Sequence, residues 1–171
     1  MLIQPPVSYG YSIARAASGA TPTAVTGAGN SFSTGIAFNT IAACLCIGVR
    51  FYAVLTGSKS YKCSVWDQTS TTRLANVTVT QSTTGLYEAI FSSGVSLTAG
   101  QFCRATIWQT DGLGYQRTVK SAMVAILPTG TRLWTGNYSM GLADVFGTGD
   151  AYPNTSAAAE GYAVEPILLI P

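Results

Sequence analysis

The chain has 171 residues, of which 47% are hydrophobic and only 9% are charged, with a net charge of +2 and no histidine. This length is that of a single domain able to bury a core, and the apolar runs fall well short of the ~20 residues that cross a bilayer, so we expect no membrane partner. The basic residues are scattered rather than clustered, so we also expect no nucleic-acid partner.

The first predicted element is an extended N-terminal arm, residues 1–31, which is rich in Ala, Gly, Thr, Ser and Pro and follows neither a helical nor a strand period. Its opening has no basic region and is interrupted by Pro5 and Pro6, so we expect no cleaved secretory leader. The arm has too few large apolar side chains to form a core, and some alternate as in a strand, which predicts that it pairs with a sheet edge of a neighbouring molecule. The residues expected to make this contact are Leu2, Ile3, Val7, Tyr9, Tyr11 and Ile13.

Residues 32–171 are predicted to form the second unit, an all-β, jelly-roll-like antiparallel β-sandwich. Short apolar runs recur there every ~8–12 residues, with turn residues between them. In AACLCIGVRFYAV, alternation predicts that Leu45, Ile47, Val49 and Phe51 share the core face. The later inward sets are Cys63 and Val65, Val77 and Val79, and Cys103, Ala105 and Ile107, and AVEPILLIP is predicted to be a closing strand with proline at an edge.

The cysteines indicate the compartment in which the chain is made. Cys44 and Cys46 lie two apart on one strand face, so they cannot easily pair with each other. Cys63 and Cys103 lie in other strands, and without histidine a zinc site would need all four thiolates. We expect four buried, free thiols in a chain made in a reducing cytosol, with a cross-strand disulfide as the alternative.

The segments GVRFY, VWDQ, LANVTVT and VSLTAGQFCRATIW, in this order, resemble a family of β-sandwich modules that is known only as a domain of unknown function. Its members occur in bacterial cell-surface and carbohydrate-active proteins. AYPNTSAAAEGYAVEPILL is similar to the loop and closing strand of that family, so the resemblance covers residues 32–171. It implies a sandwich without catalytic residues. The cysteines, and Tyr162–Ala163 in place of Tyr-Trp, depart from the family pattern and weaken the transfer of a ligand site.

The candidate carboxylate pair for acid–base chemistry is Asp144 and Asp150, around VFGTGD. Acid–base catalysis near neutral pH most often uses histidine, which is missing, and two carboxylates six apart in a loop are typical of a solvated turn. A calcium site in LADVFGTGD is a further alternative, although the alternating acids of a calcium loop are missing. We therefore expect no enzyme activity, no cofactor and no bound metal.

A glycan site is the other candidate. Sandwich modules bind sugars with exposed rings flanked by Asp, Asn or Arg. The C-terminal third supplies Trp134, Tyr138, Tyr152 and Asn154 for such a site. The alternative is that these rings pack in the core or at a subunit contact.

The arm, the weakly charged surface and the expected lack of a leader together predict a non-enzymatic virion structural protein, made in the host cytoplasm. By analogy of fold, it would be a bacteriophage capsid decoration or cement protein that contacts a capsid or other virion protein as a homo-oligomer, with a trimer as our guess. The alternative is a carbohydrate-binding or receptor-binding module of a tail fibre, a spike or a cell-surface protein.

Overall fold

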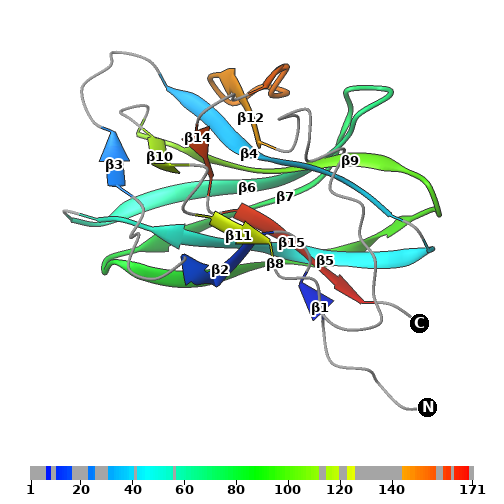
Figure 1. Cartoon of the computed structure of the whole chain (residues 1–171), viewed down its shortest axis with the longest axis horizontal. Helices are drawn as coiled ribbons and strands as arrows, with labels where there is room; N and C mark the ends of the chain where they lie inside the picture. The colour runs from blue at the N-terminus through cyan, green and yellow to red at the C-terminus, as the bar shows by residue number, and fades with distance from the viewer. Residues whose placement is uncertain are drawn as a thin grey trace.

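The computed structural model describes residues 7–8, 11–16, 23–25, 31–40, 42–55, 57–111, 115–119, 123–125, 144–156, 160–162 and 164–169. These residues form strands and connections without a helix, and most of the strands build two antiparallel sheets that pack face to face (Figure 1). The predicted antiparallel β-sandwich is thereby confirmed. Nothing in the described part of the chain is a helix able to span a membrane.

The two main sheets are made of strands that are far apart in the sequence. The four-stranded sheet has the order β1 (Val7–Ser8), β15 (Val164–Leu169), β5 (Cys44–Ala53) and β8 (Gly85–Leu97). The six-stranded sheet has the order β13 (Thr155–Ser156), β12 (Asp144–Thr148), β4 (Phe32–Asn39), β9 (Phe102–Gln109), β6 (Lys59–Asp67) and β7 (Arg73–Gln81). The chain changes sheets between β4 and β5, β5 and β6, β7 and β8, and β8 and β9, so most neighbouring strands are joined by long-range pairing.

Two small sheets complete the described structure. One contains β14 (Glu160–Gly161), β10 (Tyr115–Val119) and β3 (Thr23–Val25), and the other contains β11 (Met123–Ala125) and β2 (Tyr11–Ala16).

The core lies between the two main sheets and is built from side chains that alternate along the strands. On β6 and β9 the predicted inward residues are buried, which confirms the two-residue period of these segments. Val77 and Val79 on β7 pack against the same core and are partly buried. The fully buried side chains include Phe38, Val49, Phe51, Tyr61, Leu97, Tyr162 and Leu168.

The predicted core face of β5 is wrong in the first half of the strand. Leu45 and Ile47 are only partly buried. Cys44 and Cys46 point into the core in their place. The pairing of β5 with β8 shifts register between Cys46 and Gly48, and such an irregularity reverses which alternate residues face inward.

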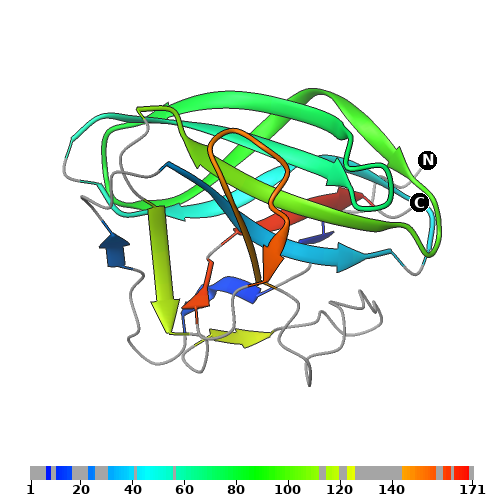
Figure 2. The same ribbon diagram turned by 90° about the horizontal axis from the view of Figure 1, so that it is seen from above.

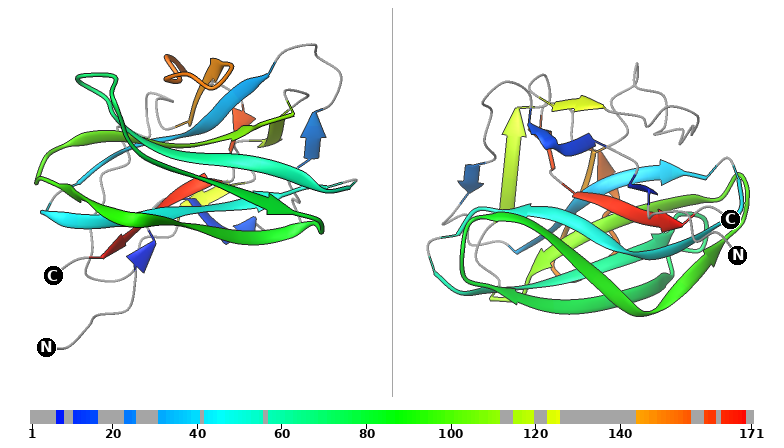
Figure 3. Two further views of the ribbon diagram at one scale, coloured as in Figure 1. Left: turned by 180° about the vertical axis from the view of Figure 1, so that it is seen from behind. Right: turned by 90° about the horizontal axis from the view of Figure 1, so that it is seen from below.

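The closing strand is present, but it does not lie at an edge. Strand β15 pairs with β5 on one side and with β1 on the other (Figure 3). Pro166 lies opposite Val49, whereas β1 reaches only Ile167 and Leu168. Proline is tolerated here because β1 does not pair with this position, so no second ladder needs its missing N–H.

The arm segment contributes strands to sheets of its own chain. Strand β1 pairs with β15, β2 with β11 and β3 with β10. Of the predicted contact residues, Val7, Tyr11 and Ile13 lie in these strands, whereas Leu2, Ile3 and Tyr9 lie outside the described residues. That residues 32–171 fold without the arm stays a prediction.

All four cysteines are free and buried, as expected for small core residues. Burial raises the pKa of the Cys46 and Cys103 thiols to about 12, and it also raises the pKa of Cys44 and Cys63. The thiolate is the reactive form, so burial protects these cysteines in two ways: reagents cannot reach the sulfur atoms, and the thiols stay protonated.

The folded chain is therefore expected to resist alkylation at about pH 8, where ordinary exposed thiols react. After unfolding in urea without reductant, all four cysteines should react. Intact mass spectrometry measures both states. Two missing modifications in the unfolded sample would reveal a disulfide and contradict the prediction, while rapid modification of the folded chain would contradict the buried placement.

Candidate functional site

The outer face of the six-stranded sheet carries polar and aromatic side chains because β6 and β9 alternate. Their inward residues enter the core, so the residues between them point to the opposite face. These outward residues are Lys62, Ser64 and Trp66 on β6, and Phe102, Arg104, Thr106 and Trp108 on β9. The pairing register places Trp66 opposite Arg104 and Lys62 opposite Trp108.

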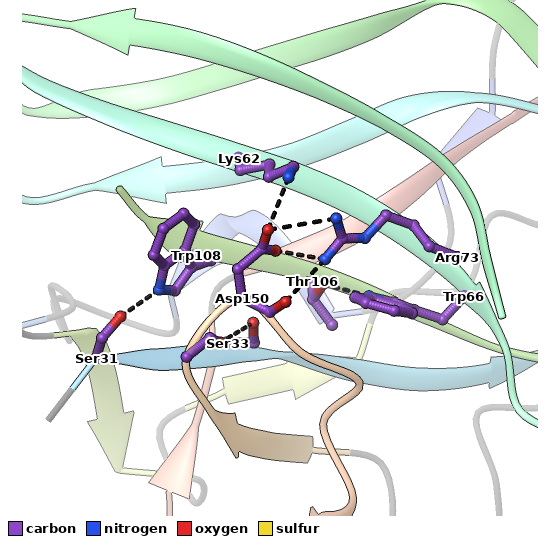
Figure 4. A network of polar contacts seen from close by, with 9 residues as sticks. Ser31, Ser33, Lys62, Trp66, Arg73, Thr106, Trp108 and Asp150 are labelled. Atoms are coloured by element: carbon purple, nitrogen blue, oxygen red, sulfur yellow. Dashed lines mark hydrogen bonds and ion pairs between the residues drawn. The ribbon is translucent and has the colours of Figure 1, made fainter. Parts of the chain in front are cut away.

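The connection between β12 and β13, residues 149–154, lies over this outer face (Figures 2 and 4). The turn begins at Gly149, whose φ of 72° is in the left-handed region that glycine adopts without strain. Its N–H donates to the Ser31 carbonyl at 2.6 Å, and its own carbonyl accepts from the Ser33 hydroxyl at 2.7 Å. These two bonds fix the start of the loop beside the first residues of β4.

The Asp150 carboxylate ties the loop to β6 and β7 (Figure 4). Its Oδ2 accepts from Lys62 Nζ at 2.7 Å and from Arg73 Nη1 at 3.3 Å, and its Oδ1 accepts from Arg73 Nη2. The three side chains are between 21% and 24% exposed, so these ion pairs are partly shielded from water. Both carboxylate oxygens are occupied by cations of the same chain, and the arrangement holds the loop in place.

Beside this clamp lies a row of two aromatic rings with a cation at each end. The Arg73 guanidinium lies 4.2 Å from the centre of the Trp66 ring, and Arg104 lies 4.6 Å from the centre of the Tyr152 ring. The two rings meet edge to face at 5.9 Å. Trp66 is buried, and its indole N–H donates to the Thr106 hydroxyl at 2.9 Å. The buried Trp66 therefore fixes the row, and its contact with Tyr152 helps to hold Tyr152 and the terminal Arg104 in position.

Arg104 differs from the other described cations because it has no carboxylate partner among the described residues. Its Nη1 donates to the Pro153 carbonyl, and its Nε lies 3.5 Å from Gln68 Oε1. Burial lowers the pKa of its guanidinium, because the charged form loses hydration. The remaining cations with described side chains, Arg50, Lys59, Lys62 and Arg73, all form ion pairs.

An exposed ring and the side-chain amide of Gln68 lie beside Arg104, and a second amide follows Pro153 in the chain. Phe102 is two residues earlier on the same face of β9 and is 45% exposed. Gln68 donates from its backbone N–H to the Phe102 carbonyl at 2.9 Å, and its own carbonyl accepts from the Tyr152 hydroxyl at 3.4 Å. Asn154 is exposed and follows Pro153. We call Gln68, Phe102, Arg104, Tyr152 and Asn154 the Arg104 patch.

Two of the four predicted glycan-binding residues, Tyr152 and Asn154, belong to this patch. Trp134 and Tyr138 lie outside the described residues. The sequence prediction missed Gln68, Phe102 and Arg104. The alternation of β9 contained a signal for two of them, because Phe102 and Arg104 alternate with the inward Cys103 and Ala105 and must therefore face outward.

The predicted carboxylate pair is divided between two environments. Asp144 is fully buried at the start of β12, where its Oδ1 accepts from the Tyr162 N–H at 3.1 Å. The expected solvated turn is wrong for Asp144, because the strand that pairs with β4 begins at this residue. Asp150 lies in the loop and is bound by Lys62 and Arg73. Within the described residues, no group of three or more His, Cys, Asp or Glu side chains could hold a metal ion.

Comparison with protein families identifies the family of this chain. A family model described as a domain of unknown function (DUF4082) matches residues 19–164. The match begins inside the segment predicted as the arm and ends at the first residue of β15. Comparison with curated proteins finds no match.

Proposed function

Because the chain belongs to the DUF4082 family, whose description assigns no activity, we propose from the geometry of the Arg104 patch that it is a non-enzymatic module that binds saccharides. The observation that supports this proposal is the exposed Phe102 ring beside the half-buried Arg104. Sugar-binding surfaces combine an aromatic ring, which stacks on the apolar face of a pyranose, with a few polar groups that fix its orientation. The side-chain amides of Gln68 and Asn154 supply such groups.

The rigidity of the patch supports the same proposal. Tyr152 is held by Trp66, Arg104 and the Gln68 carbonyl, and the loop that carries it is bound by Asp150. Side chains that are already ordered lose little conformational entropy when a ligand binds. The resemblance to modules of bacterial cell-surface and carbohydrate-active proteins also favours a saccharide ligand.

The absence of enzyme activity remains part of the proposal. The sequence has no histidine. The two carboxylates considered for catalysis are engaged in the fold, Asp144 with the Tyr162 N–H and Asp150 with two cations. Neither arrangement places a carboxylate beside an open surface where a general base would act.

Binding to a panel of immobilised glycans, followed by calorimetric titration of the best ligand, tests the proposed function. Phe102→Ala is expected to weaken binding about tenfold, because stacking and burial of the ring are lost. Leu86→Ala is the matched control, since Leu86 is 43% exposed on β8 of the other sheet. If no glycan binds, or if both substitutions weaken binding equally, the proposed function fails.

A second candidate is the virion structural protein predicted from the sequence, a decoration or cement protein of a bacteriophage shell. It is favoured by the exposed Leu86 and Ile90 on β8, which ends the four-stranded sheet, and by the low charged fraction of 9%. Apolar side chains at a sheet edge suit contact with another protein. Co-sedimentation with shells that lack the protein tests this candidate. A double substitution of Leu86 and Ile90 by serine should abolish the co-sedimentation.

A further inference from the structure

We propose that the Arg104 patch selects acidic saccharides and that Arg104 binds their anionic group. This inference rests on the proposed saccharide-binding function and specifies its ligand class. The acidic preference is inferred from the charge of Arg104, which has no carboxylate partner among the described residues, and not from the Phe102 ring.

Arg104 is a half-buried cation without a carboxylate partner in the described structure. Placing a cation in a partly desolvated position is unfavourable unless an anion or strong acceptors compensate. Arg50, whose side chain is 23% exposed, pairs with two carboxylates, and Arg73 pairs with one. Arg104 instead donates a hydrogen bond to the Pro153 carbonyl and stacks on the face of the Tyr152 ring. These contacts stabilise its positive charge less than a carboxylate does.

The guanidinium keeps donors for a ligand. Nη1 donates to Pro153, whereas Nη2 makes no hydrogen bond with any described residue. A guanidinium binds planar carboxylates through two parallel N–H groups, so it recognises a carboxylate better than a hydroxyl. The amides of Gln68 and Asn154 can donate to the same anion or to neighbouring hydroxyls.

Among the described residues, Asp67 is the carboxylate that directly precedes the patch residue Gln68 in the sequence. Its negative charge repels an anionic ligand from a greater distance than the contact with Arg104. Its Oδ1 accepts from the N–H and hydroxyl of Ser70, and its Oδ2 accepts from Gln101 Nε2 at 2.8 Å. These bonds lower the pKa of Asp67, and the ion pairs of the described residues do not include one between Asp67 and Arg104. A ligand carboxylate in contact with Arg104 interacts more strongly than a charge that is farther away.

The positions of Phe102 and Arg104 suit one sugar unit with an acidic substituent. Two residues along one face of a strand are about 7 Å apart. A pyranose stacked on Phe102 can therefore direct a substituent carboxylate toward Arg104. A neutral sugar would use the same ring and leave the cation without an anion.

The experiment compares three ligands of equal length on the full chain: an oligogalacturonate, its methyl ester and a neutral galacto-oligosaccharide. A sulfated galacto-oligosaccharide separates carboxylate recognition from general attraction of anions. We expect the oligogalacturonate to bind at least about tenfold more tightly than its ester, because a charge-assisted hydrogen bond is lost on esterification. Arg104→Gln should remove this preference, whereas Lys59→Gln, which deletes a charge from β6 at the ion pair with Asp111, should retain it.

The outcomes separate this inference from the proposed function. Equal binding of the oligogalacturonate, its ester and the neutral ligand overturns the acidic preference and leaves the saccharide-binding function standing. If neither these ligands nor any glycan of the panel binds, both the acidic preference and the saccharide-binding function are overturned. A preference for acids that persists in Arg104→Gln overturns the role of Arg104, and the ligand comparison on the unmodified chain remains decisive if that variant does not fold.

Discussion

Replacing Gly35 with alanine is expected to destabilise the sandwich by about 3 kcal/mol, at the upper end of the range for overpacking. A Cβ at this position would collide with the Ala105 carbonyl oxygen and lie 2.7 Å from Thr106 Cα. These are backbone atoms of β9, so no change of rotamer relieves the clash. Strands β4 and β9 would have to separate, which weakens the ladder at the centre of the six-stranded sheet. Denaturant unfolding followed by tryptophan fluorescence measures the loss.

Gly85→Ala is the matched control within a strand. A Cβ at Gly85 would lie 3.8 Å from the Tyr87 hydroxyl oxygen, which is an ordinary contact. Its expected effect is between no change and a gain of about 0.5 kcal/mol, because alanine restricts the unfolded chain. Equal losses in the two variants would contradict the steric explanation. Since Arg104 is carried by β9, Gly35→Ala should also weaken saccharide binding if the proposed function holds.

The core positions could be predicted wherever polar and apolar residues alternate. In KCSV of β6 and FCRATI of β9 the inward set is separated by polar or small residues, so the period identifies the buried face. In CLCI of β5 every residue is apolar, and parity then carries no signal. The register shift between Cys46 and Gly48 decides which side faces the core, and it depends on the partner strand β8.

The candidate site was predicted only in part for a related reason. Tyr152 and Asn154 stand out as an aromatic and an amide in a loop, which is a composition signal. In the sequence, Arg104 is one of several scattered cations. Only the fold shows that it has no carboxylate partner among the described residues. The partners of Asp150 are 77 and 88 residues away in the sequence, so local pattern could not identify the clamp that positions the loop.

Replacing Arg50 with methionine is expected to destabilise the chain by about 3 kcal/mol, the usual consequence of breaking a buried ion pair. Arg50 Nη1 donates to Glu165 Oε1 at 2.9 Å, and the Glu165 side chain is only 2% exposed. The substitution removes this cation from a carboxylate that water cannot readily solvate. Equilibrium unfolding of the variant measures the loss of stability.

Two further variants test the cause of that loss. Arg50 also pairs with Glu88, which is 49% exposed, so Glu88→Gln should change the stability by less than about 1 kcal/mol. Adding Glu165→Gln to Arg50→Met should recover most of the lost stability, because the buried charge is removed together with its partner. If the double variant is as unstable as Arg50→Met alone, the loss comes from the packing of the arginine stem across β5 and β8 rather than from the buried charge. If Glu88→Gln is as destabilising as Arg50→Met, exposure does not distinguish the two carboxylates and the electrostatic explanation is wrong.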